Sequence, residues 1–92
     1  MGYTMVIPEE MRRKYLERRR RDVEELSSAA ETSDPAPFVK VGHQLKGNAI
    51  TFGYKELADL GVRMEEAGQQ LNWDEAKACL ASLRSWVESQ PA

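Results

Sequence analysis

Apolar residues recur along this chain at alternating steps of three and four, the spacing that places side chains on one face of an α-helix. Four series follow it: Met11, Tyr15, Leu16, Val23, Leu26 and Ala30; Phe38, Val41, Leu45, Ala49 and Phe52; Leu57, Leu60, Met64, Ala67 and Leu71; Trp73, Ala76, Leu80, Leu83 and Val87. No segment alternates apolar and polar residues with β-branched enrichment, as strands do. The pattern therefore predicts four helices and no strands.

Proline, glycine and capping residues divide the four series from one another. Helix starts are indicated by Pro8, by Asp34 followed by Pro35, and by Asn72 with Glu75 three residues later, while Gly53 marks a helix end. We expect helices over about 8–30, 35–52, 54–71 and 73–87. Because the connections are short, neighbouring helices should be antiparallel. We predict an all-α, up-down four-helix bundle forming a single domain over 1–92, with its core at about 8–89.

Composition restricts the class of protein further. The chain has 92 residues, of which 41% are hydrophobic and 30% charged, and it contains no apolar run near the roughly 18 residues of a membrane span. Its first residues lack the basic and apolar regions of a secretory signal. The lone Cys79 cannot form an internal disulfide. We expect a cytoplasmic protein that does not bind membranes.

The run Arg18–Arg21 raises the possibility of a nucleic-acid-binding bundle. Acidic residues are interleaved with it, however, and five pairs of opposite charge fall four residues apart: Glu9–Arg13, Glu10–Lys14, Glu17–Arg21, Arg20–Glu24 and Arg21–Glu25. Such pairs stabilise a helix modestly, so a self-neutralised, solvated helix face is expected and nucleic-acid binding is not. Arg19 interrupts the apolar stripe, and its side chain is expected either to snorkel towards water or to pair with Asp22.

The one histidine, His43, is the strongest candidate for chemistry. At about 100° per residue it lies roughly 160° from Leu45, so it should point away from the core. Lys40, Lys46 and Gly47 lie three or four residues away, on the same side of the helix. Glycine inside a helix costs about 1 kcal/mol relative to alanine, and open access to the imidazole would give Gly47 a reason to be there.

The neighbourhood of His43 also contains two apolar residues outside the main stripe, Val39 and Ile50. Exposed apolar side chains around a polar centre are typical of docking surfaces. We therefore expect a docking surface formed by Val39, Lys40, Gln44 and Ile50.

The segment His43-Gln44-Leu45-Lys46-Gly47-Asn48-Ala49, with Gly53 following, resembles the H-x-L-K-G-x-A signature of histidine-containing phosphotransfer (HPt) domains. The first helix and the Glu56-Leu57 and Glu65-Glu66-Ala67 segments look like the same family, so the resemblance covers about residues 6–89. It implies that His43 is the phosphorylated residue, that Lys46 assists the phosphoryl group and that Gly47 provides access.

The same resemblance indicates the partners of the chain and the activities that it should lack. The partners would be receiver domains of response regulators or hybrid histidine kinases in a multi-step phosphorelay. The chain has no P-loop and no kinase glycine loop, so it should not phosphorylate itself from ATP. It should bind no cofactor or metal of its own, because Mg²⁺ belongs on the partner receiver. We expect a monomeric phosphocarrier.

Two alternatives besides nucleic-acid binding stay open. The chain could be a purely structural helical interaction module in which His43 is incidental. It could also be a phosphotransfer domain that once belonged to a larger kinase rather than a free-standing protein. The sequence does not name the cognate kinase or regulator, the pathway output or the direction of phosphoryl flow.

Overall fold

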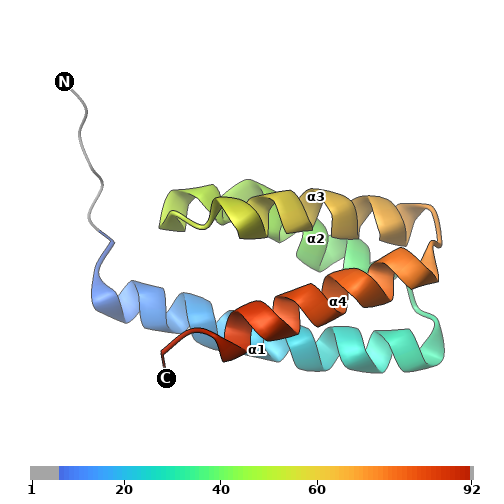
Figure 1. Cartoon of the computed structure of the whole chain (residues 1–92), viewed down its shortest axis with the longest axis horizontal. Coiled ribbons are helices and arrows are strands. Elements are labelled where there is room, and N and C mark those ends of the chain that lie inside the picture. Colours follow the sequence, from blue (N-terminus) through green and yellow to red (C-terminus); the bar gives the residue numbers. More distant parts are fainter. Residues whose placement is uncertain (1–6, 92) are drawn as a thin grey trace.

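The computed structural model describes residues 7–91, which form four α-helices and one short 3₁₀ helix. Their bounds are α1 Glu9–Thr32, α2 Ala36–Asn48, η1 Ile50–Phe52, α3 Lys55–Gln69 and α4 Trp73–Glu88. Successive α-helices run in opposite directions, with α2 and α3 in one layer and α1 and α4 in the other (Figure 1). The all-α, up-down four-helix bundle predicted from the sequence is confirmed.

Side-chain oxygens accept backbone hydrogen bonds at two of the predicted helix starts. The Asp34 carboxylate accepts a hydrogen bond from the Ala36 backbone N–H at 3.1 Å, just before α2. Asn72 Oδ1 accepts one from the Glu75 backbone N–H at 3.2 Å, as the sequence predicted. Side-chain acceptors at these positions satisfy backbone donors that have no partner inside the helix.

The second helix is shorter than predicted. It ends at Asn48, and the chain continues through the 3₁₀ turn Ile50–Phe52 to Gly53, whose φ is +83°. The backbone N–H groups of Gly53 and Tyr54 donate to the carbonyls of Ile50 and Ala49. A tighter final turn satisfies carbonyls that an α-helix would leave unpaired, and glycine adopts the positive φ that then reverses the chain.

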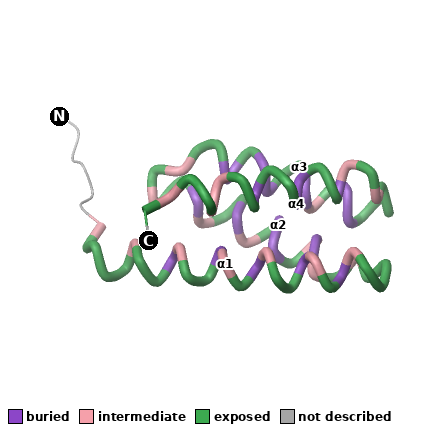
Figure 2. The backbone as a smooth tube through the Cα atoms, turned by 60° about the horizontal axis from the view of Figure 1, so that its bottom comes forward, coloured by how far each residue is buried: buried purple, intermediate pink, exposed green. Residues whose placement is uncertain are grey.

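The apolar face of each helix meets the others in one core (Figure 2). The largest fully buried side chains are Leu26, Phe38, Val41, Leu45, Leu57, Met64, Cys79 and Leu83. Three residues predicted to join it do not: Met11 is 51% exposed, Leu71 is 59% exposed, and Leu16 is half-buried outside the core. Met11 lies in the first turn of α1, which extends past the ends of α2 and α3 (Figure 1). Leu71 follows the end of α3 with φ +57° and has left the helical phase.

Three glycines bring α2 and α3 into direct backbone contact. A Cβ atom added to Gly42 would collide with the Glu65 backbone, and one on Gly61 would lie 2.6 Å from the Gly42 carbonyl oxygen. A Cβ on Gly68 would lie 2.8 Å from Val39 Cγ2. Real Cβ atoms do not approach other atoms so closely, so only glycine permits this spacing. The α2–α3 interface is consequently the most extensive in the bundle.

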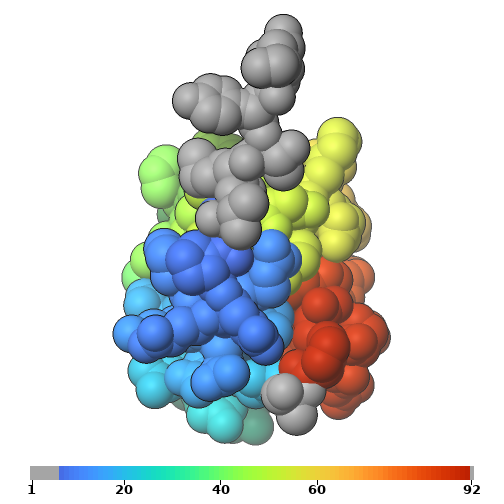
Figure 3. Space-filling view, turned by 90° about the vertical axis from the view of Figure 1, so that its left-hand side faces the viewer, coloured from blue at the N-terminus to red at the C-terminus, as the bar shows by residue number. Residues whose placement is uncertain are grey.

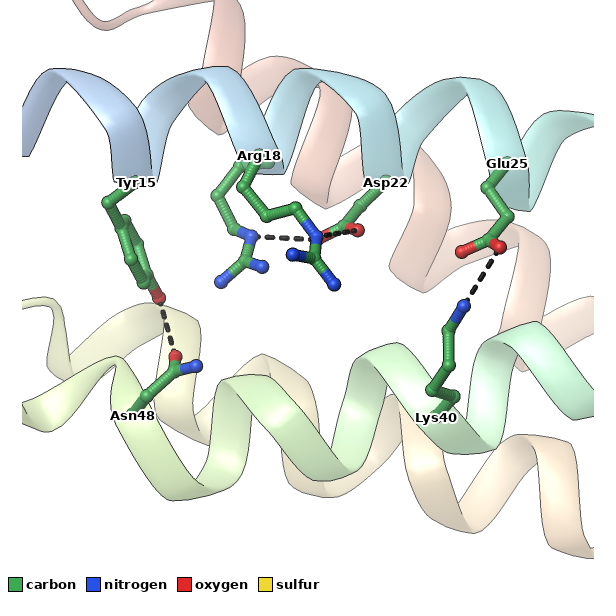
Figure 4. A network of polar contacts seen from close by, with 7 residues as sticks. Tyr15, Arg18, Asp22, Glu25, Lys40 and Asn48 are labelled. Carbon is green, nitrogen blue, oxygen red and sulfur yellow. Dashed lines mark hydrogen bonds and ion pairs between the residues drawn. The ribbon is translucent and has the colours of Figure 1, made fainter.

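Polar side chains join α1 to α2 instead (Figure 4). Tyr15 Oη donates to Asn48 Oδ1 at 2.9 Å, and Lys40 Nζ donates to Glu25 Oε2 at 2.9 Å. Lys40 and Asn48 lie eight residues apart, which is two steps of four, so both contacts lie along one side of α2. They set the separation of α1 from α2 by the length of side chains rather than by backbone contact.

Arg19 lies between these contacts, and the sequence left open whether it snorkels towards water or pairs with Asp22. Its Nε lies 2.7 Å from Asp22 Oδ2, and both side chains are buried, with 2% and 4% exposed. Arg19 therefore pairs with Asp22 and does not snorkel. The guanidinium carbon also lies 4.5 Å from the centre of the Tyr15 ring. Burial raises the pKa of the Asp22 carboxyl, and the neighbouring Arg19 charge opposes that rise.

Most of the ion pairs predicted along α1 do not form. Of the five predicted pairs, only Glu10–Lys14 forms, at 3.5 Å; in the described chain the other four do not come within 4.0 Å. Exposed ion pairs gain little in water and restrict two long side chains, so correct spacing alone does not form them. Residues 9–31 still hold seven basic and seven acidic side chains, but most of these charges are solvated rather than paired.

Candidate functional site

His43 lies in the middle of α2 with 69% of its side chain exposed, on the outward face that the sequence predicted. Its Nδ1 is 2.9 Å from Oε2 of Glu65, which belongs to α3. The other carboxylate oxygen of Glu65 accepts a hydrogen bond from Lys46 Nζ at 2.7 Å. One carboxylate from α3 thus contacts two of the predicted site residues of α2, His43 and Lys46.

The Glu65 carboxylate determines which imidazole nitrogen is free. Its hydrogen bond from Lys46, and next that from His43, hold the pKa of Glu65 below its usual value, so it is ionised at neutral pH. An ionised carboxylate can only accept hydrogen bonds. The proton of a neutral His43 must therefore be on Nδ1, which leaves the lone pair on Nε2. In the described chain Nε2 makes no hydrogen bond and belongs to an exposed side chain, so the site presents a nucleophilic nitrogen.

Two glycines of α2 flank this arrangement and differ in their surroundings. Gly47 has no atom within 4 Å of the position of an added Cβ, so the space beside His43 is open there. Gly42 is buried against the backbone of Glu65 and Gly61. The first glycine leaves access to the imidazole, whereas the second lets α3 come close enough for Glu65 to reach it.

A comparison with known protein families supports the assignment suggested by the sequence motif. The family model described as the Hpt domain matches residues 10–89, nearly the whole length. The chain belongs to the Hpt domain family. This confirms the resemblance seen in the sequence. Hpt domains are phosphotransfer modules of two-component phosphorelays, carriers rather than kinases, and their partners are receiver domains. No curated protein and no solved structure gives a significant match to the chain.

In this Hpt domain the four predicted docking residues differ in exposure and in contacts. Ile50 is 58% exposed, as expected. Val39 is half-buried, because its side chain packs on Gly68. Lys40 reaches away from His43 to Glu25 of α1, so the prediction that it flanks the imidazole is wrong. Gln44 is half-buried, with Oε1 inaccessible and without a hydrogen-bond partner in the described chain.

Two residues of the site were not identified as such from the sequence. The sequence pattern placed Glu65 in a third helix that looks like the family's, without a role, and gave Gly42 no role. A signal for both exists, since Gly61 and Gly68 lie seven residues apart on one face of α3 with Glu65 between them. A face of small residues indicates close helix contact, and a carboxylate on that face would reach the facing helix.

Other features of this Hpt domain bear on cofactors and membranes. Among residues 7–91, no group of three His, Cys, Asp or Glu side chains is placed to hold a metal ion. No helix in the same part of the chain has the length and apolar character needed to cross a membrane.

Proposed function

We propose that this Hpt domain accepts a phosphoryl group on Nε2 of His43 and donates it from there, exchanging it with receiver domains. The observation that carries the proposal is the contact of Nδ1 with the ionised Glu65, because it leaves the lone pair on the exposed nitrogen. A fixed tautomer and a fixed ring orientation are the requirements for an imidazole nucleophile. The remaining residues of the site act on this nitrogen or on what it carries.

In the accepting step, the Nε2 lone pair attacks the phosphorus of a phosphoaspartate on the receiver. An N–P bond forms, the bond between phosphorus and the carboxylate oxygen breaks, and the free aspartate carboxylate leaves. The imidazole ring becomes positively charged, and its Nδ1–H remains hydrogen-bonded to Glu65, whose negative charge stabilises it. Donation reverses these bond changes and returns the neutral ring.

Lys46 supplies positive charge next to the moving group. Its ammonium is held beside His43 by Glu65, yet 44% of the side chain is exposed, so it can also contact a phosphoryl group on the ring. Transfer of a phosphoryl group depends mainly on positioning and charge neutralisation. The rest of the charge would come from Mg²⁺ held by the receiver, which this chain does not need to bind.

Gly47 provides access for the receiver. A phosphoaspartate must approach Nε2 in line with the breaking bond, and the open space at Gly47 lies one turn from His43. Ile50, exposed one further turn along, offers an apolar contact at the edge of the same surface. The proposed site therefore consists of His43, Lys46, Gly47 and Glu65, with Ile50 on its margin.

The proposal is tested by incubating the full chain with a phosphorylated receiver and mapping the transferred phosphate. Because the chain contains one histidine, acid-labile and base-stable label on it should disappear in His43→Gln. Nitrogen-15 NMR of the labelled protein should place the phosphorus on Nε2. Incubation with ATP alone should give no label.

Two outcomes would contradict this function. Label that persists in His43→Gln would exclude His43 as the acceptor. Receiver binding without any transfer, unchanged in His43→Gln, would instead favour a structural interaction module. Phosphorus on Nδ1 would overturn the role given to Glu65 while leaving the carrier function intact.

A further inference from the structure

A second surface of the molecule lies at the end of the bundle where α1 begins. There the first turns of α1, the residue before α3 and the chain following α4 enclose a cavity of about 170 Å³. Figure 3 views this end, with α1 in blue beside the red end of α4. The residues that give the cavity its character are Glu9, Arg12, Arg13, Leu16, Arg20 and Tyr54. None of them belongs to the site around His43.

The charge of this cavity is strongly unbalanced. Three guanidinium groups line it against one carboxylate, and across residues 7–91 no carboxylate oxygen comes within 4.0 Å of Arg12, Arg13 or Arg20. Arg63, by contrast, makes a two-pronged contact with Glu75 at 3.0 and 3.1 Å. Guanidinium groups without a paired carboxylate thus gather where the surface is hollowed.

The cavity also has an aromatic and apolar lining that is held in place. Arg12 Nη1 donates to Tyr54 Oη at 3.0 Å, and its guanidinium carbon lies 5.7 Å from the centre of the Tyr54 ring. Trp86 packs edge-on against Tyr54, with ring centres 4.8 Å apart. One guanidinium is therefore positioned before any ligand arrives and keeps further N–H donors available. Leu16 and the Tyr54 ring add apolar surface beside it.

We propose that this cavity binds an acidic segment of a partner protein, in which carboxylates flank one aromatic or apolar side chain. A cavity of about 150 Å³ accommodates a benzene ring, so one such side chain fits. Neighbouring carboxylates would then meet guanidinium groups, whose planar donor pairs match carboxylates well. Such a contact would hold a partner on α1 and leave His43 on α2 free for its receiver. The inference does not depend on the proposed function of His43.

Nucleic acid fits this surface less well. A phosphate backbone needs a stripe of positive charge several phosphates long, whereas here the charge is concentrated around a cavity the size of a single side chain. A polynucleotide is therefore an outcome of the test rather than the proposed ligand.

The test is an NMR titration of the full chain, labelled with nitrogen-15, with the peptide acetyl-DEFDE-amide. Saturable shifts are expected at the Leu16 and Tyr54 amides, and the uncharged peptide acetyl-NQFNQ-amide should bind at least about fivefold more weakly. The double variant Arg13→Gln, Arg20→Gln should lower the affinity for the acidic peptide about fivefold or more. The control Arg21→Gln removes an exposed arginine of α1 that does not line the cavity, and should change affinity less than about twofold.

Helical circular dichroism of each variant confirms that it is folded, and phosphoryl transfer through His43 should be unchanged in both. The proposal is overturned if the acidic peptide does not bind, or if Arg21→Gln weakens binding as much as the double variant. It is overturned equally if inorganic phosphate at the same concentration displaces the peptide, which would indicate a small-anion site. Tighter binding of an oligothymidylate than of the peptide would point to nucleic acid instead.

Discussion

Helix α2 contacts its two neighbours in opposite ways. Towards α3 it meets backbone with backbone, because Gly42, Gly61 and Gly68 remove the side chains that would separate the helices. Towards α1 it meets long polar side chains, which include the Tyr15–Asn48 hydrogen bond (Figure 4). The first interface has little freedom to adjust, since packed backbones cannot give way. The second can absorb change by side-chain rotation where its side chains are exposed, as Lys40 is.

This difference explains where the candidate site lies. Glu65 reaches His43 and Lys46 with a single carboxylate only because α3 is close, so the geometry of the imidazole depends on the glycine interface. The α1 interface contributes no atom to the site. Instead it contains the buried Arg19–Asp22 pair, which makes it the more sensitive of the two in stability.

The largest effect should follow from breaking that buried pair. Asp22→Ala would leave the Arg19 guanidinium buried without a counter-charge, and the free energy of unfolding should fall by about 3–5 kcal/mol. Urea unfolding followed by circular dichroism measures it. His43, on another face, should still exchange phosphoryl groups in the folded fraction.

Replacing both charged residues tests the contribution of the ion pair separately from the packing of the space that it fills. Arg19→Met combined with Asp22→Leu exchanges the buried ion pair for apolar side chains, and should restore most of the loss or exceed the wild-type stability. If Asp22→Ala is itself as stable as the wild type, the buried pair does not hold α1 in the way described.

The next effect tests the glycine interface. A methyl group in Gly42→Ala would collide with the Glu65 backbone, so α2 and α3 must separate, at a cost of about 1–3 kcal/mol. The matched control is Gly47→Ala on the same helix, where the space is open and alanine should raise stability by up to about 1 kcal/mol. Equal stability of the two variants in urea unfolding would mean that Gly42 is not needed for close contact.

Gly47 is also expected to affect phosphoryl exchange. A larger residue in Gly47→Gln should slow phosphoryl exchange with a receiver while the helical signal persists, because the side chain would occupy the approach to His43. Transfer at the wild-type rate in this variant would remove the reason given for this glycine.

A smaller effect is expected from the charge next to the imidazole. Lys46→Ala should leave folding nearly unchanged, since the side chain is 44% exposed, and should slow phosphoryl exchange or shorten the phosphohistidine lifetime. Loss of one charge-assisted contact at a wet surface is worth about 1–2 kcal/mol, roughly five- to thirty-fold in rate. Lys46→Arg should recover part of the loss. Exchange by Lys46→Ala at the wild-type rate would reduce Lys46 to a solubilising residue.

The sequence predicted the bundle and the outward face of His43 because both follow from periodicity within single helices. It did not predict what depends on contacts between helices. Lys40 lies one turn from His43 in sequence, yet its ammonium goes to Glu25 of α1. Glu65 lies on another helix and became visible as a partner only once the Gly42 contact was known. The spacing of charges on α1 predicted ion pairs, but spacing fixes only proximity and not the balance between pairing and solvation.

The smallest effect concerns the pH dependence that Glu65 gives to stability. Its pKa in the folded protein is lowered, first by the hydrogen bond from Lys46 and then by that from His43. A lowered pKa means that the ionised carboxylate stabilises the fold at pH values above its unfolded pKa of about 4.3, and that this stabilisation is lost as the pH falls through the lower folded value.

Glu65→Gln should therefore unfold slightly more easily than the wild type at pH 7, and the effect is small because Lys46 and His43 are partly exposed. The difference should shrink as the pH is lowered below about 4, because the wild-type carboxyl then becomes neutral too. Urea unfolding of both proteins at pH 7, 5, 4 and 3 measures it, and Glu66→Gln controls for the loss of one exposed carboxylate from α3. A difference that stays constant over this range would show that Glu65 contributes through shape, and that its charge does not orient His43.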